Sequence, residues 1–415
     1  KGANSVAGNT VLGESALDDS VTGGNNTAIG KIALTELTSG TKNVAVGQGA
    51  LQLTTTSHNN VAIGDLALQD NVTGSDNTAV GRRALTDNTA SSNTAIGADA
   101  LLANTSGTGN TALGQGSLQS NVTGQNNTAV GQIALRDNTG SHNTAVGEEA
   151  LKENTSGASN TAVGRNVLRS NTTASNNTAI GDNSLLSNTT GTANTAVGSS
   201  ALDANTTASN NTAIGNYTLG DNTTGANNTA LGRDALGSNT TASNNTALGY
   251  DTLQVNTTGT ENTAVGALAL DATTTGSYNT GVGYLSLTTN TTGANNAAFG
   301  RKSLNSNTTG STNVAVGDGA LFANTTASNN TAVGRNAMVA NTTGSKNSAL
   351  GYNSLDANTT GENNTGIGGG ALSSNTTASD NTALGYAALN ANTTGSSNTA
   401  VGRSALTANT TGAVN

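Results

Sequence analysis

The strongest constraint on this chain is a 17-residue repeat that runs through nearly all of its 415 residues. Each repeat carries a glycine at a fixed place, and these glycines recur every 17 residues from Gly13 to Gly402, apart from two intervals of 16. A fixed short period is typical of a solenoid, in which each repeat contacts only its neighbours. The sequence therefore predicts one elongated domain over residues 1–415, with an irregular first coil at 1–8 and regular repeats at 9–415.

Numbered from its leading Asn, the consensus repeat is Asn-Thr-Ala-Val-Gly-x-x-Ala-Leu-x-x-Asn-Thr-Thr-Gly-x-Asn, and 24 repeats can be phased in this way. Two Gly positions and the Asn and Thr between them disfavour a helix. The length suits one coil of a parallel β-solenoid. The predicted fold class is therefore all-β, a parallel β-solenoid (β-roll or β-helix) of about 24 coils. We expect strands at positions 1–4 and 8–9 and an extended piece at 13–14, with turns between them.

The direction of each side chain follows from the alternation of faces along a strand. We expect the aliphatic residues of positions 4 and 9 inside the coil, with position 2 partly buried beside them. The Ala of position 3 would then face outward, at a site that is never charged or large. A run of small residues on an outer face indicates close approach of another chain or another sheet, and we take this pattern as a prediction of an oligomer.

Two columns of Asn have a mechanical explanation. In coils stacked at about 4.8 Å, an Asn amide can hydrogen-bond to the Asn amides above and below it. We interpret both columns as structural ladders rather than catalytic groups, and expect no dense N-glycosylation because a laddered Asn is a poor glycan acceptor. Members of the two ladders include Asn228, Asn245 and Asn262 at position 1, and Asn222, Asn239 and Asn256 at position 12.

Composition excludes several kinds of partner. Charged residues are only 9% of the chain, the net charge is −9, and there are six Tyr, two Phe and no Trp. Binding to nucleic acid needs clustered Lys and Arg or stacking aromatics, so we expect no nucleic-acid partner. No apolar run approaches the roughly 18 residues of a membrane span. The absence of Cys excludes disulfides and Cys-based metal sites, and we expect no cofactor and no metal.

Catalysis finds little support. The two histidines, His58 and His142, occupy variable turn positions, and acidic residues are scattered without a repeated pair. The glycines within 366–370 look like a phosphate-binding loop, but Gly recurs throughout this chain as a turn residue. A solenoid polysaccharide lyase or hydrolase would need clustered carboxylates or basic residues, which the sequence lacks. We predict that the protein is not an enzyme.

Position 6 in the C-terminal half is the candidate binding surface. Tyr and Arg suit recognition of carbohydrate or protein, because they offer flat area together with hydrogen bonds. The alternative is that these exposed turn residues only cover the coil beneath them. The column consists of Arg233, Tyr250, Tyr284, Arg301, Arg335, Tyr352, Tyr386 and Arg403.

A Thr or Ser column at position 14 offers a function of another class. Flat Thr arrays on β-solenoids resemble those of ice-binding proteins. Here two repeats lack the position, and Asn-Thr-Thr lacks the Thr-x-Thr spacing that puts two hydroxyls on one face. Ice binding is the alternative hypothesis.

The Asn-Thr-Ala-Val-Gly-x-x-Ala-Leu repeat resembles repeats of phage-type tail fibres and of bacterial surface proteins. More distantly it resembles the Asn-Ser-Val-Ala-Ile-Gly repeat of trimeric autotransporter adhesin heads, with Asn4 to Gly8 as the nearest literal match. The resemblance implies a β-roll, a fibrous homotrimer, an extracellular or virion location and a role in attachment. The period of 17 departs from the shorter repeats of the adhesin heads, and no coiled-coil stalk is present.

These observations lead to one functional hypothesis. We expect an extracellular or cell-surface structural fibre protein, or a virion fibre, that forms or extends a stable filament and has an adhesive role. Expected partners are further copies of the chain, joined end to end or as a homotrimer, and surface glycans or a cell-surface receptor bound by a tail-fibre-type shaft. Stacking 24 coils at about 4.8 Å would give a rod of roughly 115 Å.

Overall fold

The protein is a parallel β-solenoid, as the sequence predicts. The computed structural model describes residues 6–17 and 20–415, and in this part of the chain each coil contributes one three-residue strand and there is no helix. Two compact units divide the chain, Lys1–Ser209 (unit 1) and Asn210–Asn415 (unit 2), and each is described by itself. The single domain over 1–415 stays a prediction, and residues 1–5 of the predicted irregular first coil lie outside the described residues.

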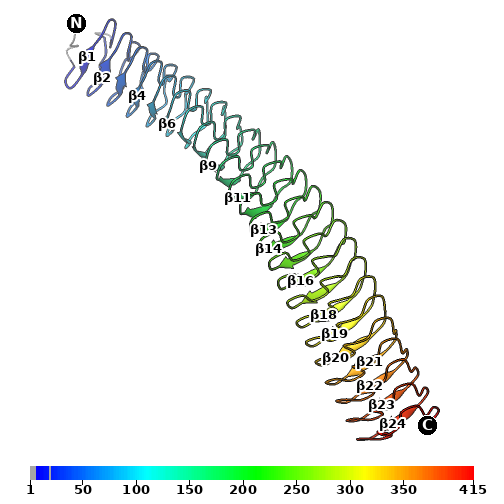
Figure 1. Cartoon of the computed structure of the whole chain (residues 1–415). Helices are drawn as coiled ribbons and strands as arrows, with labels where there is room; N and C mark the ends of the chain where they lie inside the picture. The colour runs from blue at the N-terminus through cyan, green and yellow to red at the C-terminus, as the bar shows by residue number, and fades with distance from the viewer. Residues whose placement is uncertain (1–5, 18–19) are drawn as a thin grey trace. The chain divides into compact units, whose positions relative to one another are not determined.

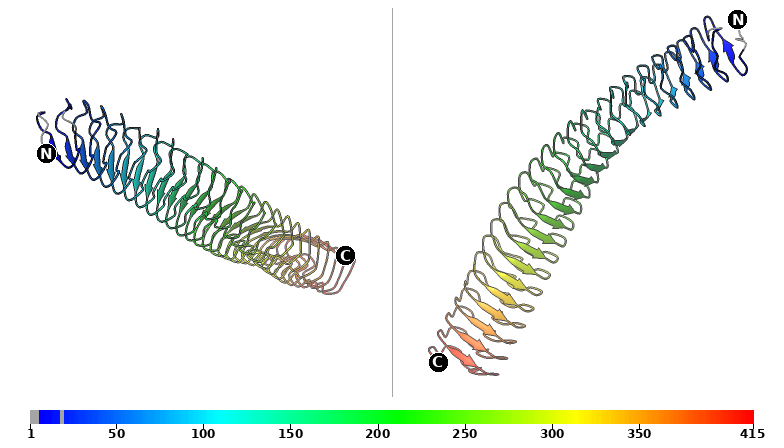
Figure 2. Two further views of the ribbon diagram at one scale, coloured as in Figure 1. Left: turned by 90° about the horizontal axis from the view of Figure 1, so that it is seen from above. Right: turned by 180° about the vertical axis from the view of Figure 1, so that it is seen from behind.

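Within each unit the strands follow one another in chain order (Figures 1 and 2). Unit 1 holds β1 (Thr10–Leu12), β2 (Thr27–Ile29), β3 (Val44–Val46), β4 (Val61–Ile63), β5 (Thr78–Val80), β6 (Thr94–Ile96), β7 (Thr111–Leu113), β8 (Thr128–Val130), β9 (Thr144–Val146), β10 (Thr161–Val163), β11 (Thr178–Ile180) and β12 (Thr195–Val197). Unit 2 holds β13 (Thr212–Ile214), β14 (Thr229–Leu231), β15 (Thr246–Leu248), β16 (Thr263–Val265), β17 (Thr280–Val282), β18 (Ala297–Phe299), β19 (Val314–Val316), β20 (Thr331–Val333), β21 (Ser348–Leu350), β22 (Thr365–Ile367), β23 (Thr382–Leu384) and β24 (Thr399–Val401).

Neighbouring strands within a unit pair in parallel at identical repeat positions. Thr229 lies opposite Thr246 and Leu231 opposite Leu248, for example. The register survives the one-residue deletions, since Thr78 still pairs with Thr94 across the first of them. The missing residue is one of the paired Thr at positions 13–14, which lie on a bend outside the strand, so the strand and both Asn positions keep their places.

The side chains of each strand point in the opposite directions to those predicted. Ala230 at position 3 is fully buried, whereas Leu231 at position 4 is 42% exposed. The same holds along both units, where the middle residue of each strand after β1 is buried and its two neighbours are not. The Ala column therefore lines the core. The outer face of the sheet carries mostly Thr at position 2, with Val, Ala or Ser in a few strands, and an aliphatic residue or Phe at position 4. The argument for an oligomer from outward Ala is wrong.

The room inside the coil explains this choice. At Gly281, which takes the place of Ala at position 3, an added Cβ would lie 3.3 Å from Cδ1 of Leu270 on the preceding coil. With Ser286 Oγ at 3.1 Å as well, little room is left at this position beyond a methyl group. Leu at position 9 is buried in the core as predicted, with 0% exposure at Leu270.

The predicted second strand at positions 8–9 is absent, because the chain turns sharply there. Leu236 at position 9 has φ 52° and Asp234 at position 7 has φ 56°, both in the left-handed region. This conformation costs a non-Gly residue about 1–2 kcal/mol, and burial of the Leu side chain contributes about 1.5–3 kcal/mol, which is enough to offset it. The third piece at positions 13–14 is a bend rather than a strand.

Glycine is required at position 5, where the strand ends. Gly232 has φ 134°, and an added Cβ would lie 2.2 Å from the carbonyl oxygen of Gly249 on the next coil. The coils approach each other too closely at this point for any side chain, so every strand is followed by Gly.

The two Asn ladders are confirmed and differ in their bonding. At position 12 the amide groups bond directly to one another, with Asn239 Nδ2 donating to Asn222 Oδ1 at 2.7 Å and Asn256 Nδ2 to Asn239 Oδ1 at 3.0 Å. At position 1 the side-chain oxygen accepts the backbone N–H of the next Asn, as between Asn228 and Asn245 at 2.9 Å and between Asn245 and Asn262 at 2.9 Å. All six predicted members are buried, and hydrogen bonds between coils satisfy polar groups that would otherwise be costly inside, except at Asn256 Oδ1, which has no partner among the described residues.

Candidate binding surface

The predicted column at position 6 lies in unit 2, on the loop that follows each strand. Its four tyrosines are all exposed, from 45% at Tyr250 to 61% at Tyr386, and its four arginines are exposed as well. Consecutive coils stack in chain order, so neighbours in the column are about 4.8 Å apart along the stack. The fold therefore brings together residues that are 17 apart in sequence.

Arginine and tyrosine pair within this column. The guanidinium carbon of Arg233 lies 4.6 Å from the Tyr250 ring centroid, and Arg233 Nη2 donates to the Tyr250 hydroxyl oxygen at 2.6 Å. Arg335 lies 5.8 Å from the Tyr352 ring and Arg403 5.7 Å from the Tyr386 ring. These distances fall within the range of cation–π attraction. Hydrogen bonding with Asp251 raises the pKa of the Tyr250 hydroxyl, and the nearby Arg233 charge acts in the opposite direction.

Two five-residue sets in the column follow the same pattern. Each reads Arg, Tyr, small residue, Tyr, Arg on five successive coils. The first set is Arg233, Tyr250, Ala267, Tyr284 and Arg301, and the second is Arg335, Tyr352, Gly369, Tyr386 and Arg403. Two of the arginines also form ion pairs, Arg233 with Asp234 and Arg301 with Asp318, each at 3.1 Å.

A hollow lies in the second set, between the two tyrosines. It has a volume of about 230 Å³ and is lined by Tyr352, Asn353, Gly369, Gly370, Ser373, Tyr386, Ala387 and Asn390. An added Cβ at Gly369 would lie 3.6 Å from Cδ2 of Tyr386, so the ring rests against the bare glycine backbone. The first set has Ala267 and Leu268 where the second has two glycines.

Polar groups form the floor of the hollow. Asn390 Nδ2 donates to the carbonyl oxygen of Gly370 at 3.0 Å. Asn353 Oδ1 is buried and has no hydrogen-bond partner among the described residues. Burial raises the pKa of the neighbouring Asp356 carboxyl, while hydrogen bonds from Ser373 and from the backbone act to lower it. The floor therefore offers amide and hydroxyl groups, with one acceptor unmet.

Sequence reasoning found the two walls of this hollow but missed its floor. Tyr352 and Tyr386 were in the predicted column, whereas Asn353, Ser373 and Asn390 were not. The glycines at 366–370 were the available signal. Gly366 lies in β22, but the neighbouring pair Gly369 and Gly370 opens the hollow.

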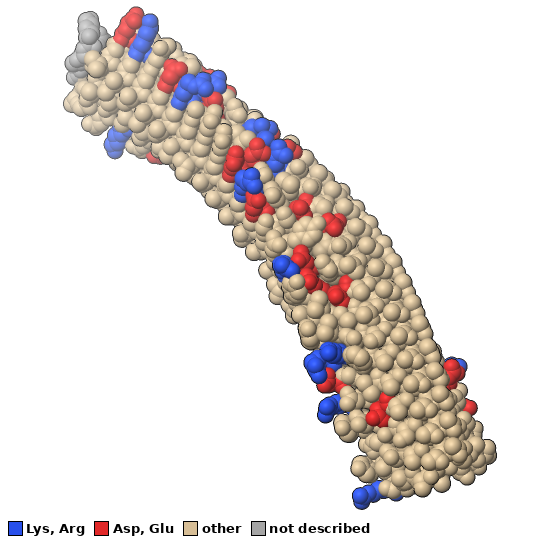
Figure 3. Space-filling view, viewed as in Figure 1, with Lys and Arg blue, Asp and Glu red and all other residues tan. Residues whose placement is uncertain are grey.

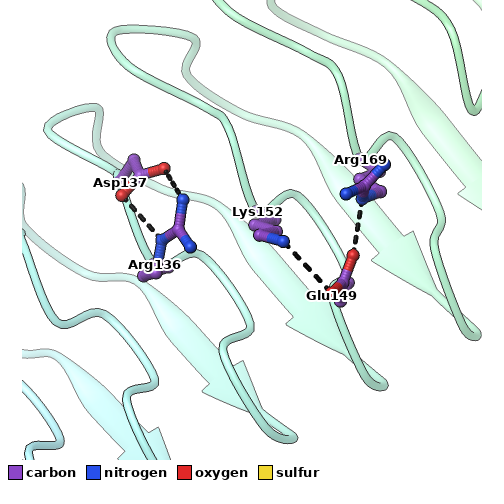
Figure 4. A network of polar contacts seen from close by, with 5 residues as sticks. All are labelled: Arg136, Asp137, Glu149, Lys152 and Arg169. Atoms are coloured by element: carbon purple, nitrogen blue, oxygen red, sulfur yellow. Dashed lines mark hydrogen bonds and ion pairs between the residues drawn. The ribbon is translucent and has the colours of Figure 1, made fainter.

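The surface of unit 1 has another character, dominated by ion pairs. Glu149 bonds to Lys152 at 3.1 Å and to Arg169 at 2.5 Å, while Arg136 bonds to Asp137 (Figure 4). Burial acts to raise the pKa of Glu149, but the hydrogen bonds and charges of Lys152 and Arg169 outweigh it and leave the pKa lowered. Lys and Arg lie beside Asp and Glu on the face shown in Figure 3.

The remaining candidate groups do not form a site. His58 and His142 are exposed on turns, as their positions predict. Among residues 6–17 and 20–415, no cluster of three or more His, Cys, Asp or Glu side chains is placed to hold a metal ion. In the same part of the chain no helix has the length and apolarity needed to cross a bilayer.

Comparison with protein-family models and with curated proteins finds no match to this chain. The resemblance to tail-fibre and adhesin-head repeats therefore stays a prediction from the repeat itself.

Proposed function

We propose that this protein is a non-enzymatic structural fibre protein, located outside the cell, on its surface or on a virion, which forms or extends a stable filament. The pair of buried Asn ladders, unbroken at position 1 and interrupted in a few coils at position 12, carries the proposal. Each coil satisfies its buried amides through its neighbours, as Asn239 does with Asn222 and Asn256. Stability then grows with the number of stacked coils, which suits a load-bearing rod.

The proposal includes self-association with further copies of the chain. The outward face of the sheet supports this part of it. Leu231 and Leu248, on neighbouring coils of unit 2, are each 42% exposed, and Phe299 and Leu350 continue the exposed column. Contiguous apolar surface of this kind is typical of protein–protein contacts. Copies that met side by side, as in the predicted homotrimer, would bury this column, and end-to-end contact would extend the ladders.

Electron microscopy of the purified protein, with particle lengths recorded, tests the filament. Long continuous fibres are expected, whereas discrete particles near the roughly 115 Å estimated from coil spacing would contradict end-to-end joining. Sedimentation tests the lateral contact. Leu248→Lys should lower the oligomeric state, and Thr241→Lys, at an exposed position away from the sheet, should leave it unchanged.

Ice binding is a second candidate, favoured by an observation on the same face. Thr and an aliphatic residue stand at positions 2 and 4 of nearly every strand, in register from coil to coil, as Thr229 and Leu231 do with Thr246 and Leu248. This regular array lies on the sheet, unlike the position-14 Thr column, which lies on bends. A thermal hysteresis assay separates the two functions, and activity that Thr246→Lys removes would favour ice binding.

Attachment to surface glycans or to a cell-surface receptor is the adhesive part of the proposal. The exposed Tyr and Arg column of unit 2 supports it, since these side chains combine flat apolar area with hydrogen-bonding groups.

A further inference from the structure

We propose that the hollow between Tyr352 and Tyr386 is a saccharide subsite that takes one neutral sugar ring of an oligosaccharide. This inference deepens the adhesive part of the proposed function by naming its site and ligand class. It rests on the hollow, its two aromatic walls and its polar floor.

The walls are set at a separation that suits a sugar ring. Tyr352 and Tyr386 are on coils two apart, so their backbones are separated by about 10 Å along the stack. A ring in van der Waals contact with both, at ~4 Å from each, needs about 8 Å between the two tyrosine rings. The Tyr386 ring, which rests against Gly369, would turn away from Gly369 to leave that room. A puckered pyranose ring is thicker than a flat heterocycle and fills such a gap better. Its C–H faces would lie against the two tyrosine rings.

The two arginines hold the walls from outside. Because the coils stack in chain order, Arg335 precedes Tyr352 and Arg403 follows Tyr386. Each guanidinium lies within 6 Å of its ring centroid, at 5.8 Å and 5.7 Å. One side of each tyrosine is thus covered by Arg, and the other is directed toward the coil of Gly369.

The floor supplies hydrogen-bonding groups, and none of the residues that line the hollow is charged. Asn353, Ser373 and Asn390 line the hollow with amide and hydroxyl groups. Asn353 Oδ1 has no partner among the described residues but is itself buried, so the Asn353 amide would turn toward the hollow to accept a hydrogen bond from a sugar hydroxyl. Neutral polar groups beneath aromatic walls match the alternating apolar faces and hydroxyl rim of a neutral sugar.

The first set provides an internal comparison. Tyr250 and Tyr284 have the same spacing, but Ala267 and Leu268 stand between them in place of Gly369 and Gly370. Position 6 accepts Tyr on other coils, so Gly369→Tyr should close the hollow and still fold. Tyr284→Ala removes an equally placed, exposed Tyr outside the hollow and is the matched control.

Titration of the full chain with chitohexaose, cellohexaose and maltohexaose, by calorimetry and by tyrosine fluorescence, tests the site. There is no Trp to mask the tyrosine emission. At least one saccharide should bind with Kd below about 1 mM. Tyr352→Ala, Tyr386→Ala and Gly369→Tyr should each weaken it by about tenfold, the usual worth of an aromatic contact, and Tyr284→Ala by less than about twofold.

Three outcomes would overturn the assignment. The first is that none of the three neutral saccharides binds. The second is that Gly369→Tyr leaves binding intact although its melting temperature is unchanged. The third is that sialyllactose or adenosine binds in place of the neutral saccharides. Filament formation is measured separately, by electron microscopy without saccharide. Fibres that bind no sugar would therefore refute the saccharide subsite and leave the filament proposal standing. Sugar binding by discrete rods would refute the filament alone.

Discussion

Units 1 and 2 are built on the same coil and differ in what stands on its outer loop. Both bury Ala at position 3, Leu or Met at position 9 and the Asn ladders. Unit 1 carries nine Lys or Arg and fifteen Asp or Glu, against six and nine in unit 2, whereas all six Tyr belong to unit 2. Exposed loops tolerate this divergence because their side chains leave the core and ladders untouched. The comparison separates what the fold demands from what a surface is free to change.

The largest effect should come from the core that the two units share. Leu168→Ala in unit 1 and Leu253→Ala in unit 2 each remove a fully buried side chain and should cost about 3 kcal/mol. Hydrogen exchange read by mass spectrometry reports each unit separately in the full chain. Losses differing by more than about 1.5 kcal/mol, half the expected effect, would break the claim of a common core.

A gain in stability is expected where the ladder of unit 2 is interrupted. Thr273 replaces Asn at position 12, and both its hydroxyl and Asn256 Oδ1 are buried without a partner among the described residues. Thr273→Asn should stabilise by about 1 kcal/mol, the net value of a restored hydrogen bond. In unit 1, Thr54 donates to the Asn71 carbonyl oxygen at 2.6 Å, so Thr54→Asn is the control and should gain less. Equal gains in denaturant melts would contradict this reasoning.

The two units should respond oppositely when a carboxyl is neutralised at pH 7. The pKa of Glu149 is lowered from its ordinary 4.5, so its charge stabilises unit 1, and Glu149→Gln should destabilise it. Burial raises the pKa of Asp356 above its ordinary 3.8, so its charge destabilises unit 2, and Asp356→Asn should stabilise it.

The pH dependence checks the sign of both effects. The Glu149 contribution is present above 4.5 and is lost as pH falls through the lowered pKa. The Asp356 penalty is present above its raised pKa and disappears as pH falls toward 3.8. Hydrogen exchange should show that the stability difference between each variant and the parent becomes smaller from pH 7 to pH 3. A Glu149→Gln variant more stable than the parent at pH 7 would refute the stabilising role of the Glu149 charge.

The smallest effects should come from single surface contacts. Arg165→Ala breaks the exposed pair with Asp182, at 3.0 Å, and should lower the melting temperature only slightly, because solvent screens exposed pairs. Arg233→Ala removes both the contact with the Tyr250 ring and the ion pair with Asp234 at 3.1 Å, and should lower the melting temperature somewhat more. At 1 M salt, where screening acts beyond about 3 Å, the first effect should vanish and part of the second should remain. Melting curves at low and high salt measure this, and an identical salt response would remove the distinction between the two surfaces.

Much of this protein was determined by its sequence. The 17-residue period required stacked coils in parallel register, and the invariant Asn at position 1 required a partner on each neighbouring coil. Gly at position 5 marked the end of every strand, as at Gly232. These features follow from periodicity alone, because in a stack each residue meets its own copy.

Tertiary structure decided which side of the strand faces inward, and what the loops hold. Alternation allows either Ala230 or Leu231 to point into the coil, and both are apolar. The choice fell to Ala because Leu of position 9, turned inward by a left-handed backbone, already fills the interior, as the tight fit at Gly281 beside Leu270 shows. The hollow at Tyr352 and Tyr386 likewise needs residues from three coils at once, and no single repeat contains it.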